Sequence, residues 1–165
     1  MDALQMPPLT MATSKAGLAA GTTTTITIGN TTLFAIKGKA YSKGSASNAA
    51  TPTTDITTGA AFVAVPANYG CVFVVGLDSS GAIKVAQGPL QVLDGAADGA
   101  NAKFILAPQF PIVPDTICPI GYVVTKVGAS GSSWTFGSSN LAGPPSNVLH
   151  TFVDVMTLPD RPQVA

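Results

Sequence analysis

The sequence predicts an all-β fold, a jelly-roll-like β-sandwich with an extended N-terminal arm. Three observations support this prediction. About eight short segments are rich in β-branched and aromatic residues, and turn residues separate them. Glycine and proline are frequent, with 17 Gly and 13 Pro in 165 residues. No stretch has the apolar spacing of a helix longer than about two turns. We expect an arm over residues 1–21 and a sandwich domain over residues 22–165.

Three segments are predicted to lie outside the sandwich strands. The arm contains Pro7-Pro8 and an Ala-rich piece over residues 11–21, for which we expect an extended chain with about one helical turn. Residues 42–59 are mostly Ser, Asn, Thr, Ala and Gly, which is typical of a long surface connection or an irregular edge. Prolines at positions 108, 111, 114 and 119 cannot donate ladder hydrogen bonds, so residues 108–119 are expected to cross the surface.

The first strands of the sandwich are expected behind the arm. Two β-branched runs, residues 22–28 and 31–36, flank the dipeptide Gly29-Asn30, which is typical of a two-residue hairpin turn. Alternation along the first run places Ile26 and Ile28 on one side and threonines on the other. We therefore expect a hairpin here, with its isoleucine side buried.

The strongest local signal lies in the middle of the chain. An apolar run over residues 71–77 and a second run over 82–87 are separated by Asp78-Ser79-Ser80-Gly81. Aspartate at the first turn position can accept backbone hydrogen bonds, and glycine at the fourth can adopt a positive φ. This pattern predicts a tight β-hairpin.

Further strands are predicted by short β-branched or aromatic runs. They are expected at residues 61–65, 103–106, 121–127, 133–136 and 148–156, with a loop at 95–102. The run at 148–156 alternates, so that Val153 and Phe152 belong to opposite faces.

Composition excludes several classes of protein. Eight Lys and Arg balance eight acidic residues, and the net charge of zero offers no field that would attract nucleic acid or an anionic membrane. Only 10% of residues are charged, against about 25% in an average soluble domain. Mean hydropathy is +0.39, and soluble monomers rarely expose large apolar patches. We therefore expect an oligomer, without a secretory signal or membrane span of its own.

Residue types suited to catalysis are scarce. The chain has one His, one Arg and no Glu, and no Gly-x-Ser-x-Gly or phosphate-binding glycine motif. His150 shares a strand face with Asp154, but no nucleophile is signalled, so we interpret it as a surface or interface histidine. Cys71 and Cys118 lack the spacing of a metal or redox motif, and Cys71 is expected to pack as a small apolar residue. We expect no enzyme activity, catalytic residue or cofactor.

Two other groups of residues were weighed as sites. Asp78, Asp94 and Asp98 have no calcium-loop spacing, and Asp78 is explained by its turn, so no metal site is expected. The aromatic pair Trp134 and Phe136 could stack on a base or a sugar, but core packing is the favoured interpretation.

One basic pattern is a candidate for partner binding. Lys37, Lys39, Tyr41 and Lys43 recur at every second residue, which places them on one face if the segment is a strand. The favoured interpretation is a solvated face that protects a sheet edge, because lysine on an edge strand blocks unwanted pairing. The alternative is a contact with an acidic partner.

Four parts of the chain carry a family resemblance. They are Pro119-Ile120-Gly121-Tyr122-Val123-Val124, Ser133-Trp134-Thr135-Phe136-Gly137-Ser138-Ser139-Asn140-Leu141, Phe152-Val153-Asp154-Val155 with Leu158-Pro159-Asp160-Arg161-Pro162, and Gly76-Leu77-Asp78-Ser79-Ser80-Gly81. These strings resemble small β-rich capsid proteins of tailed bacteriophages. The chain is similar over about residues 22–162 to the head decoration (cement) family. These strings are structural, so the resemblance implies a role and no site residues.

The resemblance implies a structural virion protein, made in the bacterial host cytoplasm and located on the outer capsid surface. It implies a homotrimer that binds the major capsid protein and staples neighbouring copies, with no nucleic acid or membrane as partner. An alternative is a head-fibre or tail-fibre type module for host recognition. Such a module is expected beside a repeat or a coiled-coil shaft, and the sequence has neither. A β-rich adhesin or pilus subunit is a further alternative, which the missing signal peptide disfavours.

Overall fold

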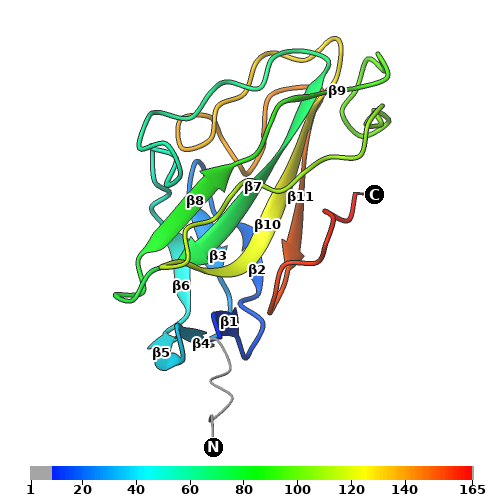
Figure 1. The fold of residues 1–165 in the computed structure, drawn as a ribbon. Helices are drawn as coiled ribbons and strands as arrows, with labels where there is room; N and C mark the ends of the chain where they lie inside the picture. Colours follow the sequence, from blue (N-terminus) through cyan, green and yellow to red (C-terminus); the bar gives the residue numbers. More distant parts are fainter. Residues whose placement is uncertain (1–8, 165) are drawn as a thin grey trace, which may run out of the picture.

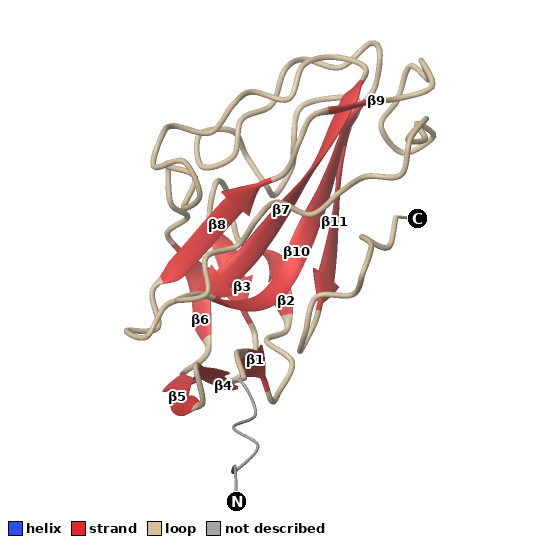
Figure 2. Cartoon of the chain, viewed as in Figure 1, coloured by secondary structure: helices blue, strands red, loops and turns tan. Residues whose placement is uncertain are grey.

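The computed structural model describes residues 9–164, and this range forms β-strands and loops without a helix (Figure 2). The strands are β1 (Met11–Ala12), β2 (Leu18–Ala20), β3 (Ile26–Ile28), β4 (Thr32–Ile36), β5 (Lys39–Lys43), β6 (Ala46–Ala49), β7 (Tyr69–Leu77), β8 (Ile83–Gln87), β9 (Gln91–Val92), β10 (Cys118–Val127) and β11 (Val148–Asp154). All pairings between them are antiparallel. The predicted all-β class is confirmed.

A long twisted sheet forms the centre of the molecule (Figure 1). Its strand order is β11-β10-β7-β8, and the short β9 also pairs with β7. The predicted hairpin at 71–87 is confirmed as β7 and β8, and the predicted strands at 121–127 and 148–156 are confirmed as β10 and β11. Strands β7 and β10 are buried along nearly their whole length. Their continuous apolar runs follow from this position, because both faces of the sheet are covered.

Two three-stranded sheets cover one face of the central sheet. Their strand orders are β1-β4-β5 and β2-β3-β6. Ile26 and Ile28 of β3 and Phe34 of β4 are buried in one cluster with Phe73 and Val75 of β7. The layers therefore meet around a shared apolar core, as in a β-sandwich. A jelly-roll strand order stays a prediction.

Irregular chain covers the other face. Val72, Val74, Tyr122 and Val124 form a second apolar cluster there, against side chains of the segment 104–113 and of the chain after β11. Figure 1 shows the chain between β9 and β10 running diagonally across this face. The backbone N–H of Gln163 donates to the Tyr122 hydroxyl at 2.8 Å, which fastens the C-terminal segment to the sheet.

The predicted hairpin around Gly29-Asn30 is wrong. Strands β3 and β4 belong to different sheets, and the backbone N–H groups of Gly29 and Asn30 donate to the carbonyls of Gly17 and Ala16. The hairpin turn lies one segment later, at Lys37-Gly38 between β4 and β5, where φ is 50° and 79°. Positive φ at both central residues is the geometry of a type I′ turn.

The segment from residue 9 to residue 21 is part of the folded body. It contains β1 and β2, and Ala12 and Ala16 are fully buried. The expected helical turn between residues 11 and 21 is therefore wrong, because this segment pairs with β4 and β3 instead. Residues 1–8 of the predicted arm, including Pro7-Pro8, lie outside the described residues.

Three predicted strands are reduced to single bridges. Ala61 pairs with Thr54, Val65 with Trp134, and Leu93 with Phe104, without extension into ladders. The strands expected at 61–65, 103–106 and 133–136 are therefore wrong. Conversely, the segment expected to be a surface connection or irregular edge contains β6, an edge strand whose register with β3 shifts between Ile26 and Ile28.

Pro119 lies inside β10, although it was expected in a surface connection. Proline is tolerated there because the register of β10 with β7 shifts between Pro119 and Gly121. Such a bulge is one of the few places in a sheet that a residue without an N–H can occupy.

Candidate functional site

The basic residues predicted as a partner-binding face lie on the β4–β5 hairpin. Lys39, Tyr41 and Lys43 occur at alternate positions of β5, as the spacing indicates. Lys37 does not share their face, because it lies in the turn with a φ of 50°. Its Nζ is 2.8 Å from the Oδ2 of Asp115, and both side chains are largely exposed.

The basic face of β5 is the side that borders the core. Tyr41 pairs with the buried Phe34, and the two rings stack with centroids 5.6 Å apart. The Lys39 ammonium lies 5.5 Å from the Tyr41 ring centroid, within cation–π range. Because β5 is an edge strand of its sheet, these lysines extend past the core rim at an exposed edge. Lysine on an edge strand protects that edge from unwanted pairing.

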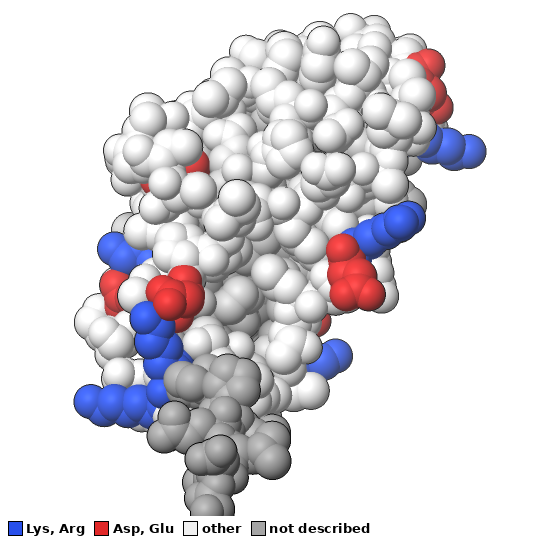
Figure 3. Space-filling view, viewed as in Figure 1, with Lys and Arg blue, Asp and Glu red and all other residues white. Residues whose placement is uncertain are grey.

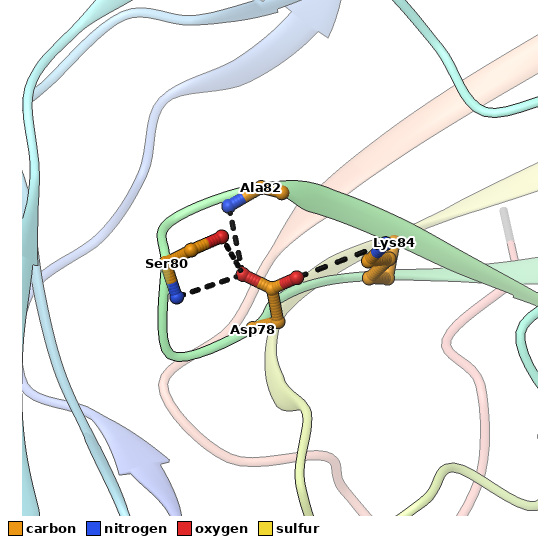
Figure 4. A network of polar contacts seen from close by, with 4 residues as sticks. All are labelled: Asp78, Ser80, Ala82 and Lys84. Carbon is orange, nitrogen blue, oxygen red and sulfur yellow. Dashed lines mark hydrogen bonds and ion pairs between the residues drawn. The ribbon is translucent and has the colours of Figure 1, made fainter.

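A second polar group lies in the β7–β8 turn (Figure 4). Asp78 Oδ1 accepts hydrogen bonds from the Ser80 N–H at 2.9 Å, the Ser80 hydroxyl at 2.6 Å and the Ala82 N–H at 3.0 Å. The Lys84 ammonium is 3.7 Å from Oδ2. Partial burial alone would raise the pKa of Asp78, but these hydrogen bonds and Lys84 hold it below its usual value. Lys43 packs its stem near Gly81 of the same turn.

The ion pairs leave a small basic surface at this end of the molecule. Lys37 and Lys84 are each paired with a carboxylate, whereas no ion pair within residues 9–164 joins Lys39 or Lys43 to an acid. In Figure 3, several Lys or Arg side chains gather at the lower end of the molecule, around β4 and β5 in Figure 1. Two cations on the same face of a hairpin strand can recognise an acidic surface.

His150 is half-buried and packs against the fully buried Trp134. Its Nδ1 is 3.0 Å from the Thr125 hydroxyl, its ring centroid is 4.5 Å from that of Trp134, and its Nε2 is buried without a hydrogen-bond partner. Burial lowers its pKa to about 4, although the Asn140 carbonyl opposes this shift. Asp154 instead accepts the Leu18 N–H at 2.8 Å, so no His–Asp pair forms.

The two cysteines are buried and free. The Cys71 thiol lies 3.1 Å from the Gly88 carbonyl, and burial raises its pKa to about 12. Burial likewise raises the pKa of Cys118 to about 11. Thiols in this state are poor nucleophiles and metal ligands, because the reactive form is the thiolate.

The remaining candidates have structural roles. Asp94 accepts the backbone N–H groups of Lys103 and Ala96, mainly the former, and these bonds lower its pKa. Asp98 accepts the Ala100 N–H at 2.7 Å. Between residues 9 and 164, no three His, Cys, Asp or Glu side chains are close enough to hold a metal ion. Trp134 and Phe136 are fully buried in the core, which excludes them as a stacking platform.

Sequence reasoning missed two buried charged groups. Asp55 accepts the N–H groups of Thr57, Thr58 and Gln87, and the pattern Asp-x-Thr-Thr is a signal for such a local turn. Lys126 in β10 donates its ammonium to the Ala102 carbonyl at 2.9 Å. Burial lowers the pKa of Lys126, while nearby aspartates oppose the shift. A lysine in an apolar run gives no sequence signal for that role.

A pocket of about 500 Å³ lies beside the end of β8. Its lining is largely apolar and comes from residues 55–63 and 87–90, two segments that are distant in the sequence.

Comparison with known proteins found no protein-family model, no curated protein and no solved structure that matches the chain. In the part of the chain that the structure describes, no helix is long and apolar enough to cross a membrane.

Proposed function

We propose that the protein is a structural virion subunit, which binds the outer capsid surface of a tailed-phage head and staples neighbouring major capsid proteins. In this proposal it is made in the bacterial host cytoplasm, acts as a homotrimer, and has no catalytic activity, cofactor, nucleic acid or membrane partner. The resemblance to head decoration proteins supplies the role.

The observation that carries the proposal is that the aspartate side chains serve as hydrogen-bond acceptors for the backbone. Side chains that could perform acid–base chemistry instead accept backbone N–H groups and hold loops and segments together. They are Asp55, Asp78, Asp94, Asp98 and Asp154. Rigid loops on a layered core suit a protein that joins other proteins, because little conformational entropy is lost on binding.

The binding free energy of such a subunit is the sum of many weak contacts. Lys39 and Lys43 are suited to acidic groups on the shell, and exposed ion pairs contribute roughly 0.2–1 kcal/mol each. Salt screens these pairs, so apolar and backbone contacts supply the remaining affinity. In a trimer, once one subunit has bound, the contacts of the other two become effectively intramolecular. The trimer therefore binds more tightly than a single subunit would.

Purified undecorated capsids test the proposal. Wild type is expected to bind at saturable occupancy and to raise the temperature at which the heads rupture. The double variant Lys39→Ala, Lys43→Ala is expected to bind more weakly at low salt and to differ little from wild type at high salt. Lys15→Ala, Lys103→Ala is the matched control, since it removes two exposed cations elsewhere.

Two outcomes contradict the proposal. Absence of binding to capsids, together with binding to intact host cells, would favour the alternative of a host-recognition module. Equal loss of binding in both double variants would show that net charge, and not the β5 surface, is recognised.

A further inference from the structure

The outer edge of β5 carries unpaired backbone groups. On β4, Leu33 lies opposite Ser42. The Leu33 N–H donates to the Ser14 hydroxyl at 2.8 Å and its C=O accepts the Thr13 N–H at 2.8 Å, so Leu33 makes its hydrogen bonds on the side of β4 away from β5. Bonded and non-bonded pairs alternate along an antiparallel ladder. The backbone groups of Ser42, and those of Ala40 two residues earlier, therefore point away from β4.

These backbone groups are accessible to a partner. Ala40 and Ser42 are both exposed. Within residues 9–164, no group forms a hydrogen bond with the N–H or C=O of either residue. An edge strand in this state can pair with a further strand, because each added ladder bond joins a free donor to a free acceptor. Strand β5 can therefore bind an extended segment.

The side chains beside this edge select the charge of the added strand. Lys39 and Lys43 lie on one face of β5 with Tyr41 between them, and neither lysine forms an ion pair within residues 9–164. Their Cα atoms are about 13 Å apart, the length of four residues in a strand. A strand paired with β5 places its own side chains directly opposite these residues, where opposite charges attract and like charges repel.

A second copy of β5 is a poor partner for this edge. Antiparallel pairing of two copies centred on Tyr41 would place Lys39 of each copy opposite Lys43 of the other. Two directly opposed pairs of like charges are destabilising. A strand that carries carboxylates at the same two positions gains two favourable pairs instead, so charge complementarity identifies an acidic segment as the occupant.

We propose that β5 binds, by strand addition, an extended acidic segment with two carboxylates four residues apart and an apolar residue midway between them. The carboxylates lie opposite Lys39 and Lys43. The apolar residue lies opposite Tyr41 and extends the stack of Tyr41 on Phe34, whose ring centroids are 5.6 Å apart. The inference deepens the proposed function and rests on it only for the source of the segment, the major capsid protein.

A short peptide tests the pairing without capsids. The probe has seven residues, with Asp at the second and sixth positions, Val at the fourth and Thr elsewhere, and its ends are acetylated and amidated. NMR of the isotope-labelled full chain measures its binding, with a Kd expected on the order of 1 mM. The backbone amides of Ala40 and Ser42 are expected to shift, and to exchange with solvent more slowly, when the peptide is bound.

Two altered peptides separate strand pairing from general charge attraction. The first exchanges Asp at the sixth position with Thr at the fifth, which moves one carboxylate to the opposite face at the same net charge. Its affinity is expected to be about threefold lower. The second carries N-methyl groups at the third and fifth positions, which removes the donors that face Ala40 and Ser42, and its affinity is expected to be at least about tenfold lower. N-methylation at the fourth position, whose N–H points away from β5, is the matched control.

Charge reversal in the protein completes the test. Lys39→Glu, Lys43→Glu is expected to bind the Asp peptide at least about tenfold more weakly and to prefer a peptide with Lys at the second and sixth positions. Lys15→Glu, Lys103→Glu, which changes two exposed lysines elsewhere, is expected to keep the wild-type preference. Unchanged NMR signals away from β5 show that each variant folds.

Three results would overturn the inference. They are absence of binding at about 5 mM peptide, equal affinity for the original and altered peptides, and binding without protection of the Ala40 and Ser42 amides. Failure of the wild type to bind capsids would instead remove the proposed function and leave the strand pairing intact, because no capsid is present in these measurements.

Discussion

His150 lies between Thr125 and Trp134, with one ring nitrogen hydrogen-bonded and the other buried without a partner. A neutral imidazole satisfies this site with one hydrogen bond, whereas an imidazolium would bring a charge into the core. The fold therefore selects the neutral form. Partial burial thus lowers the pKa of His150, although its sequence context gives no sign of this.

Acid is expected to destabilise the fold through His150. Its pKa is about 4 in the folded protein against a usual 6.5. Between these values the unfolded chain holds a proton that the folded chain lacks, so stability falls as pH decreases from about 6.5 to about 4. The loss is at most about 3.5 kcal/mol, at roughly 1.4 kcal/mol per pKa unit. Urea unfolding across this range measures it.

The variant His150→Gln separates this effect from the carboxylates. It cannot titrate, so its unfolding free energy is expected to stay nearly flat between pH 6.5 and 4. The lowered pKa values of Asp78 and Asp94 begin to act near pH 5 and act mainly below about pH 4. A wild-type slope retained in His150→Gln would assign the acid sensitivity to another group.

At the scale of elements, local patterns identified the strands that are held by continuous apolar runs. Strands β7, β8, β10 and β11 were predictable because their sequences match long ladders. The role of Asp78 in the β7–β8 turn was predictable too, since its carboxylate accepts N–H groups at most four residues away in the sequence.

Long-range pairing decided the elements that local patterns missed. Gly29-Asn30 is a good turn dipeptide, but both edges of β3 are occupied by β2 and β6, so β4 pairs elsewhere. The run 133–136 alternates because Trp134 and Phe136 are core residues, and not because it belongs to a ladder. Burial and strand pairing produce the same period, which explains the wrong strand predictions.

The Lys37-Gly38 turn makes a prediction about stability. Lys37 has a φ of 50°, a conformation that asparagine adopts more readily than alanine. Lys37→Asn is therefore expected to be more stable than Lys37→Ala by roughly 0.5–1 kcal/mol. Both variants lose the ion pair with Asp115, so their difference isolates the backbone effect. Thermal or urea unfolding of the two variants measures it, and equal stability would show that the turn relaxes at no cost.

At the scale of the whole molecule, the candidate site was only partly predictable. Period-two spacing placed Lys39, Tyr41 and Lys43 together on β5, but it could not show that this side borders the core. The pocket beside the end of β8 had no sequence signal, because residues 55–63 and 87–90 meet only in the folded chain. The proposed capsid-binding role depends on the family resemblance. The structure adds a candidate contact surface for that role, the lysine side of β5.

Thiol labelling tests whether the central sheet opens as one unit. Cys71 in β7 and Cys118 in β10 are fully buried on paired strands, with pKa values raised by burial to about 12 and about 11. Reaction with an alkylating reagent at pH 7 therefore requires the sheet to open, and both thiols are expected to react at similar, slow rates that rise in parallel with urea. Mass spectrometry of Cys71→Ala and Cys118→Ala variants assigns each rate. Much faster labelling of Cys118 would instead show that the Pro119 end of β10 separates from β7 while the rest of the sheet stays closed.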